Sequence, residues 1–340
     1  MRGDYLFLIS LLSIASVVML YLGSQPSHTY IYGTVHSLKE RIDKTVRDRM
    51  PDCCNEMNKE CFACAAGILV KDFCSRHAGR YGCPKNTIPI DCKKQTVSGT
   101  RVKTKTTPSF LIYTHEYKTD VHVSGSIQRS GIWERHFIIQ FASYLDRYPS
   151  AYVIDIGANI GMYSLFAAKK GHVVYAFEPV RKNIIRQCNS IIDNNFTNLN
   201  LFPYALSHKA LTVNFKEPSD NVGGTHTVET EETLGVENVD YAKAYTLDSF
   251  KIPNDKPIIM KIDIEGSECE MMNGAHEFFH THDIKMILME WGQVAKRCKT
   301  INTIIKTLQS KGLYIYDAGG KRRLNTTEKP WTKHWDVVWK

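Results

Sequence analysis

Three short acidic motifs contain the residue types needed to bind and orient a ligand. The first, Asp155–Gly161 (DIGANIG), directly follows an apolar run and precedes a helical pattern. In an open α/β sheet, such a turn lies at the crevice where ligands bind. We expect Gly157 to let the backbone approach the ligand closely and Gly161 to let the helix pack against the strand. Asp155 would receive a ligand ammonium, directly or through water.

The second motif is Phe177-Glu178-Pro179, at the end of the next apolar run. Glu178 comes 21 residues after Gly157, where a carboxylate can accept both hydroxyls of an adenosine ribose, as in dinucleotide sites. The sequence has neither the GxGxxG phosphate motif nor a P-loop. The pattern therefore favours S-adenosylmethionine as the ligand. The alternative is an ordinary strand–turn–helix unit with a solvated Glu178.

The third motif, Lys261–Glu268 (KIDIEGSE), follows another apolar run. Methyl transfer from a sulfonium requires a nucleophile held about 3–3.5 Å from the methyl carbon, and a group that accepts its proton. Asp263 and Glu265 are our first candidates for that base, and His226 in the segment GGTHT is the second. Alternatively, the two carboxylates only shape the turn and orient the donor.

A divalent cation is an open alternative at the same edge of the sheet. Glu290 ends the next apolar run, so Asp263 and Glu290 would flank the cation. Mg²⁺ or Mn²⁺ would suit such hard oxygen ligands. We keep the cation as an alternative cofactor and assign no metal ligands from the sequence.

The spacing of these motifs resembles that of FkbM-type methyltransferases, a branch of the class I S-adenosylmethionine-dependent enzymes. The resemblance spans roughly residues 150–275. It is carried by the stretches VIDIGANIGMYS at 153–164, VYAFEP at 174–179, YALS at 204–207, YTLDSF at 245–250 and KIDIEGSE at 261–268.

The resemblance implies a role for each matching position. The donor would lie over the carboxyl ends of the strands of a seven-stranded sheet. Gly157, Asn159 and Gly161 would line its methionine and ribose side, with Asp155 nearby. Glu178 would hold the ribose, and the adenine would be bordered by Tyr204 and Ala205.

The apolar pattern agrees with this fold class. Strand-like runs at 152–156, 172–177, 199–204, 258–263, 284–290 and 313–316 alternate with helical patterns, which predicts a mostly parallel sheet with helices on both faces. Residues 335–339 would add an antiparallel edge strand. We therefore expect a class I methyltransferase (Rossmann-like) fold, preceded by a transmembrane helix and a small cysteine-rich module.

The N-terminal segment predicts a membrane anchor. Residues 5–23 carry no charge over 19 positions, and a helix of this length spans about 28 Å, close to the bilayer core. A cleaved signal peptide and a buried helix are the alternatives. The expected order is a cytoplasmic tail (1–4), the anchor (5–23), a stem (24–50), a cysteine-rich module (51–92), a basic exposed linker (93–107) and the methyltransferase domain (108–340).

The cysteines and sequons indicate the compartment. Seven of the ten cysteines lie between residues 53 and 92, which predicts disulfides. Zinc bound by Cys61, Cys64, Cys74 and His77 is the rival interpretation. We expect Cys269 to be a buried thiol or half of a disulfide. With sequons at Asn195 and Asn325, these features suggest a single-pass type II protein whose body faces the Golgi or another secretory lumen.

The composition is that of a globular protein, 43% hydrophobic and 23% charged, with a formal charge of +8. No motif for RNA or DNA accompanies that mild charge, so we expect no nucleic-acid partner. Because glycans are the abundant hydroxyl acceptors of the lumen, we predict a glycan O-methyltransferase. A methyltransferase of lipids or small molecules and a non-enzymatic interaction protein on the same fold are the alternatives.

Overall fold

A computed structural model describes residues 89–216, 226–229, 241–292, 298–326 and 336–340. The predicted tail, anchor and stem, and the cysteine-rich module up to Cys83, lie outside the described residues. Within the described residues, no helix is both long and apolar enough to cross a membrane.

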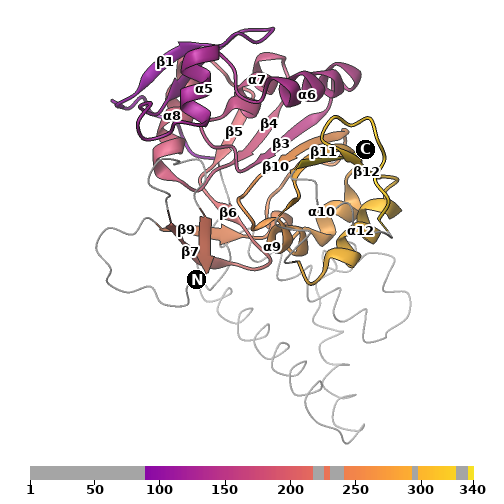
Figure 1. Ribbon diagram of the computed structural model, residues 1–340. Coiled ribbons are helices and arrows are strands. Elements are labelled where there is room, and N and C mark those ends of the chain that lie inside the picture. The colour runs from indigo at the N-terminus through magenta and orange to yellow at the C-terminus, as the bar shows by residue number, and fades with distance from the viewer. Residues whose placement is uncertain (1–88, 217–225, 230–240, 293–297, 327–335) are drawn as a thin grey trace, which may run out of the picture. The chain divides into compact units, whose positions relative to one another are not determined.

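The described part is built on a seven-stranded sheet in the order β12-β13-β11-β10-β3-β4-β5 (Figure 1). The five strands from β11 to β5 are parallel, and β13 is antiparallel to both of its neighbours. Each apolar run predicted as a strand forms one of them. The strands are β3 (Tyr152–Ile156), β4 (Val174–Phe177), β5 (Leu199–Phe202), β10 (Ile258–Ile262), β11 (Ile284–Glu290), β12 (Ile315–Asp317) and β13 (Asp336–Trp339).

The position of β13 corrects one prediction. The strand is antiparallel as expected, but it lies inside the sheet, between β11 and β12, and not at its edge. Its last three residues, Val337, Val338 and Trp339, are fully buried. Pairing on both sides satisfies the backbone groups that an edge strand would leave open, and β12 forms the edge instead.

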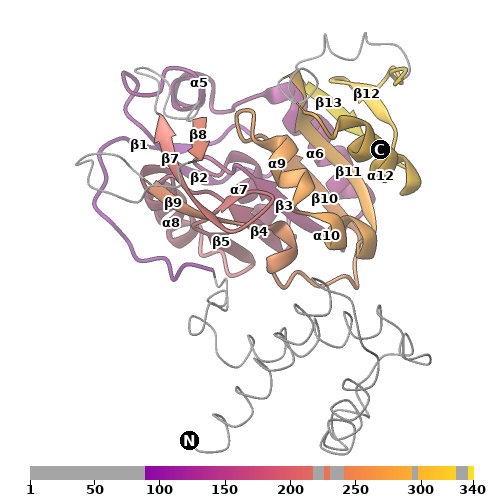
Figure 2. The same cartoon turned by 90° about the horizontal axis from the view of Figure 1, so that it is seen from below.

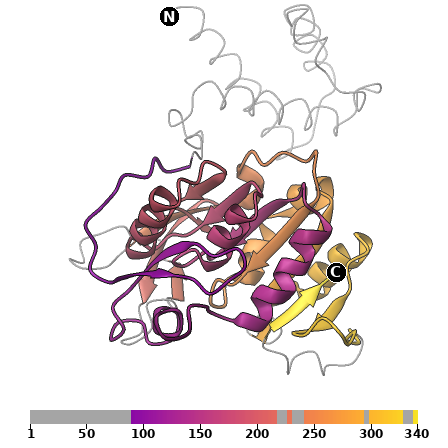
Figure 3. The ribbon, with the colours of Figure 1, turned by 90° about the horizontal axis from the view of Figure 1, so that it is seen from above.

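Helices cover both faces of the sheet because successive strand residues point to opposite sides. Val153 and Ala176 pack on one helical layer, and Ile154 and Phe177 pack on the other. Figure 3 looks onto the first layer. That layer contains α5 (Val123–Ser130), α6 (Arg135–Arg147), α7 (Met162–Lys169) and α8 (Arg181–Asp193), and the second contains α9 (Glu268–Asn273), α10 (His276–Thr281) and α12 (Ile301–Ser310).

A small four-stranded sheet, which the sequence analysis did not predict, follows β5 in the chain (Figure 2). Its order is β6-β9-β7-β8, and only the β6–β9 pair is parallel. Its strands are β6 (Ala205–Leu206), β7 (Leu211–Lys216), β8 (His226–Glu229) and β9 (Tyr241–Tyr245). The β5–β6 connection thereby passes the carboxyl end of the main sheet.

Residues 90–115, which we call the N-terminal strap, contain strands β1 (Thr100–Lys103) and β2 (Leu111–Thr114). Hydrogen bonds and a disulfide fix the strap to α8. The Asn194 amide, just after α8, exchanges two hydrogen bonds of 2.9 and 2.7 Å with the backbone of Leu111. A disulfide also joins Cys92 to Cys188. Residues 93–107, predicted as an exposed linker, are mostly exposed but include β1.

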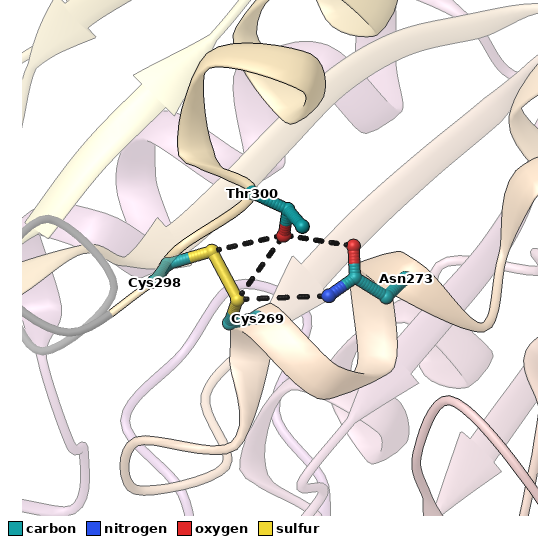
Figure 4. Close-up of a disulfide and its surroundings, with 4 residues drawn as sticks. All are labelled: Cys269, Asn273, Cys298 and Thr300. Carbon is teal, nitrogen blue, oxygen red and sulfur yellow. Dashed lines mark hydrogen bonds between the residues drawn. A yellow bond between two sulfur atoms is a disulfide. The ribbon is translucent and has the colours of Figure 1, made fainter.

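A second disulfide, Cys269–Cys298, joins the start of α9 to the segment before α12 (Figure 4). Thr300 lies beside it, with its hydroxyl 3.5 and 3.4 Å from the two sulfur atoms, and donates a 2.9 Å hydrogen bond to Asn273. Cys269 is therefore half of a disulfide, one of the two states predicted for it.

Candidate donor-binding and methyl-transfer site

A cavity of about 280 Å³ lies at the carboxyl ends of β3, β4 and β10, bordered by the β5–β6 connection and by β7. Parallel strands bring their carboxyl ends to one edge of a sheet, so motifs that are distant in the sequence meet there. Seven of the ten predicted site residues line the cavity: Gly157, Asn159, Glu178, Tyr204, Ala205, Asp263 and Glu265.

Glu178 is a buried side chain of this cavity whose carboxylate is fixed by three hydrogen bonds. It is 3% exposed. One carboxylate oxygen accepts the backbone N–H of Asn159 at 2.7 Å, and the other accepts from the Val180 N–H at 2.9 Å and from the Asn183 amide at 3.2 Å. Burial raises the pKa of Glu178 to about 7, although these donors oppose the shift. Glu178 is thus an oriented acceptor next to the glycine turn.

Gly157 is required by the protein backbone itself. Its φ is +78°, and a Cβ at this position would overlap the carbonyl oxygen of Asp263. The N–H of Asp263 in turn donates to Ile156 at 3.0 Å. The two motif loops therefore pack directly on one another. The backbone at Gly157 lies close to the Asp263 carbonyl on one side and lines the cavity on the other.

Asp155 and Gly161 do not line the cavity. Asp155 is fully buried behind the turn, where it accepts a 2.5 Å hydrogen bond from Ser164 in α7. Burial raises its pKa, opposed by the charge of Lys261. Gly161, with φ +93°, begins α7, and a Cβ there would lie 3.1 Å from Gln187 of α8. The tight packing at Gly161 is therefore against α8, not against the strand.

Lys261 is surrounded by the carboxylates of Glu134, Asp155, Asp263 and Asp336. Its ammonium lies 3.1 Å from Asp263, donates to the Gly157 carbonyl at 3.1 Å, and stands 5.2 Å from the centre of the Tyr163 ring. Burial opposes its charge, but the neighbouring carboxylates hold the pKa of Lys261 above its ordinary value. This buried cation keeps its nearest carboxylate, Asp263, in a fixed position.

Glu290 ends β11, next to the end of β10, and is 6% exposed. Burial, and then the charges of Asp263 and Glu268, raise the pKa of Glu290 to about 9. Glu290 is hydrogen-bonded to Asp263, and such a bond between two carboxyl groups needs one shared proton. Asp263 is thus held from one side by Lys261 and from the other by the protonated Glu290, with its own side chain 37% exposed.

Glu265 and Glu268 shape the loop between β10 and α9. Glu265 has φ +53° and lines the cavity. Glu268 is fully buried and accepts the backbone N–H groups of Ile264 at 2.9 Å and Gly266 at 3.3 Å. Burial raises the pKa of Glu268 to about 7. Glu268 therefore stabilises the turn that presents Asp263.

His226, the second candidate for the base, begins β8 and pairs with Lys216 of β7. The side chain of His226 lies outside the described part of the structure. Among the described residues, no group of three His, Cys, Asp or Glu side chains could hold a metal ion. At the position where a cation between Asp263 and Glu290 was considered, the Lys261 ammonium lies 3.1 Å from the Asp263 carboxylate.

The sequence analysis overlooked two buried amides of α8. Asn183 bonds Glu178, and Gln187, fully buried, donates to the carbonyl of Asn159 at 2.6 Å. Asn159 itself has φ +52°. The i, i+4 spacing of the two amides was the available signal, because it puts both on one face of the helix that follows the Glu178 motif.

Together, the parallel sheet, the glycine turn and the carboxylate at the next strand end define an α/β domain with a ligand cavity at the carboxyl edge of its sheet. Residues 155–315 match the model of the methyltransferase FkbM domain. The chain therefore carries an FkbM-type methyltransferase domain over these residues.

One curated relative is similar over part of the domain. Over 127 residues, the chain is 29% identical to the hexuronic acid methyltransferase AglP of Haloferax volcanii. The matched region covers 35% of this chain and 48% of that protein. The chain thus spans about half the length of the relative that it matches.

Two solved structures show remote likenesses. SMU.1697c of Streptococcus mutans, a putative methyltransferase in complex with SAH, is 12% identical with a TM-score of 0.35, over 61% of this chain and 98% of that one. TYW2 of M. jannaschii, in complex with AdoMet, is 13% identical with a TM-score of 0.34, over 73% of this chain and 87% of that one.

Proposed function

We propose that this protein is an S-adenosylmethionine-dependent O-methyltransferase that methylates a hydroxyl of a glycan sugar in the Golgi or another secretory lumen. One observation carries the proposal. The oriented carboxylate of Glu178 and the exposed carboxylate of Asp263 border one cavity, within a domain of the FkbM family.

In this proposal the donor lies across the glycine turn. Glu178 accepts the ribose hydroxyls, and Tyr204 and Ala205 border the adenine. The turn at Gly157 and Asn159 lines the path toward the methionine part. The sulfonium methyl then points toward the Asp263 end of the cavity, where the β10–α9 loop stands.

The transfer is an in-line displacement. The acceptor oxygen attacks the methyl carbon, the carbon–sulfur bond breaks, and its electron pair goes to sulfur, which leaves S-adenosylhomocysteine. The hydroxyl proton passes to the Asp263 carboxylate, which Lys261 and Glu290 hold in place. Proton transfer of this kind contributes about 10²–10⁴-fold to a rate.

Three observations support the choice of a lumenal glycan. The curated relative is named a hexuronic acid methyltransferase. The described part contains two disulfides, and disulfides persist in oxidising compartments. Asn195 and Asn325, the two sequon asparagines, are both exposed. The predicted anchor at residues 5–23 would hold the body at the membrane.

The test is a transfer assay with the full chain, made in a secretory host and purified in detergent. The protein is incubated with methyl-labelled S-adenosylmethionine and with glycans, lipids and small hydroxylated compounds in separate reactions. Label on a glycan that is lost with Glu178→Ala supports the proposal. Label only on lipids or small molecules contradicts the acceptor class, and absence of donor binding contradicts the enzyme itself.

A further inference from the structure

The N-terminal strap ends at a buried histidine that faces the donor side of α8. His115 follows β2 directly and is 2% exposed. Its backbone N–H donates to Ser124 at 3.0 Å, and its ring nitrogen Nε2 lies 2.7 Å from the amide oxygen of Asn183. His115 lies outside the segment 155–315 that matches the family model.

The hydrogen-bond roles in this contact are determined by chemistry. The Asn183 amide nitrogen donates to Glu178, so its amide oxygen faces His115 and can only accept. Nε2 must therefore carry the proton. Burial lowers the pKa of His115, which keeps the ring neutral, and the other charges around it are Arg186, Asp120 and Lys182.

We propose that His115 and Asn183 are positioning residues of the donor site, which act in series to orient the Glu178 carboxylate toward the donor ribose. The inference rests on the proposed donor-binding function. His115 fixes the rotation of the Asn183 amide, and Asn183 occupies one lone pair of Glu178 at 3.2 Å. The remaining acceptor capacity of Glu178 is thereby aimed into the cavity.

The strap does not need His115 to stay in place. The Cys92–Cys188 disulfide holds its beginning, and the Asn194 and Ser190 side chains hold the backbone of β2. Ser190 accepts the Tyr113 N–H at 2.9 Å, only two residues before His115. Loss of the His115 ring is therefore expected to change the donor site more than the attachment of the strap.

We call the hydrogen-bonded series His115–Asn183–Glu178 the relay. The charges that face Glu178 determine how the pH dependence of donor binding reports on it. Its partners are the N–H groups of Asn159 and Val180 and the Asn183 amide, with Lys261 as the nearby cation. All of them favour the ionised carboxylate, which is the form whose remaining acceptor capacity can take up the donor ribose. A looser Asn183 amide would leave Glu178 protonated up to a higher pH.

The experiment measures binding of S-adenosylhomocysteine to the full chain by calorimetry between pH 6 and pH 9. His115→Leu removes the ring N–H that donates the hydrogen bond to Asn183. His115→Gln is the matched control, because the amide nitrogen of glutamine can reach the position of Nε2. Asn183→Leu is the second variant, should His115→Leu not fold, and the melting temperature reports folding for each.

We expect His115→Leu and Asn183→Leu to weaken binding about 3- to 10-fold, as loss of one hydrogen bond would, and to move the pH midpoint of binding upward. His115→Gln should stay within about 2-fold of the unchanged protein. Unchanged affinity and midpoint in both leucine variants, while Glu178→Ala removes binding, would overturn the relay and leave the donor site standing. If the unchanged protein binds no S-adenosylhomocysteine, the proposed function and the relay both fail.

Discussion

The carbonyl oxygen of Asp263 lies against the Cα of Gly157, and leaves no room there for a side chain. The contact joins the loop after β3 to the loop after β10, which are adjacent parallel strands. One loop belongs to the turn on which the donor is proposed to lie, and the other carries the proposed base. Their relative position is therefore fixed by backbone packing before any ligand binds.

This packing predicts the effect of Gly157→Ala. The methyl group would overlap the Asp263 carbonyl, and the positive φ adds strain, so we expect a loss of about 2 kcal/mol or more in the free energy of unfolding and weaker donor binding. Gly171→Ala is the matched control, because Gly171 has φ +94° but nothing within 4 Å of its Cβ position. It should cost only about 1–2 kcal/mol. Urea unfolding measures both, and equal losses would remove the steric explanation.

Asp263→Asn should reduce turnover by about 10²–10⁴-fold and leave donor affinity nearly unchanged. The amide keeps the shape of the side chain but cannot take the acceptor proton. Glu265→Gln, in the same loop and on the same cavity, is the comparison, and kinetics with a labelled donor measure both. Should Glu265→Gln lose turnover while Asp263→Asn keeps it, the role of base would pass to Glu265.

The sequence predicted the main sheet well because its signal is local. An apolar run of strand length such as Ile258–Ile262 needs burial on both faces, and only a central strand provides it. The internal position of β13 could not be read in this way, because burial does not say which neighbours a strand pairs with. The small sheet was missed because its pairs, such as Ala205 with Ala244, are distant in the chain.

The candidate site was predicted in part for the same reason. Residues within the motifs, such as Gly157 and Glu178, are identified by their position after a strand. The side chains that support them are not, because His115 and Asn183 come from elements whose contact depends on the folded chain. The electrostatic role of Lys261 could not be predicted from the sequence either, since its charged neighbours Glu134 and Asp155 are distant from it in the chain.

Stability should fall as the pH rises above the acidic range. Burial raises the pKa of Glu290 to about 9, and those of Glu178, Glu268 and Asp336 to about 7. The native state then holds more protons than the unfolded chain between about pH 4.5 and pH 9, so the free energy of unfolding decreases as the pH rises through this window.

Glu290→Gln tests this linkage. The variant cannot ionise at that position, so its stability should depend less steeply on pH between 7 and 9. The exposed Glu116→Gln is the control and should follow the unchanged protein. Melting temperatures at several pH values give the comparison. Parallel curves for Glu290→Gln and the unchanged protein would show that Glu290 is not the buried acid described here.

Loss of the Cys269–Cys298 disulfide should lower both stability and turnover. The two cysteines are 29 residues apart, and releasing a loop of that length costs about 3–4 kcal/mol in the chain-entropy model. Cys269 directly follows Glu268, which holds the loop of Asp263, so the double serine variant should also lose turnover. Replacing Cys92 and Cys188 by serine is the matched comparison. Loss of that disulfide should lower stability slightly more, because its cysteines are 96 residues apart, but it should lower turnover less. Equal turnover in both double variants would contradict a specific role of the first disulfide.

The proposed lumenal orientation predicts glycosylation at Asn195. This residue is exposed in the turn after α8, with Thr197 exposed beside it, so a glycan would not meet packed atoms. The full chain expressed in a eukaryotic secretory host should lose mass on treatment with a glycosidase that removes N-linked glycans, and Asn195→Gln should remove part of that loss. Asn325→Gln serves as the second site. A chain of unmodified mass that also has free thiols at Cys269 and Cys298 would indicate that the body faces a reducing compartment. The proposed acceptor would then change from a lumenal glycan to a cytosolic lipid or small molecule.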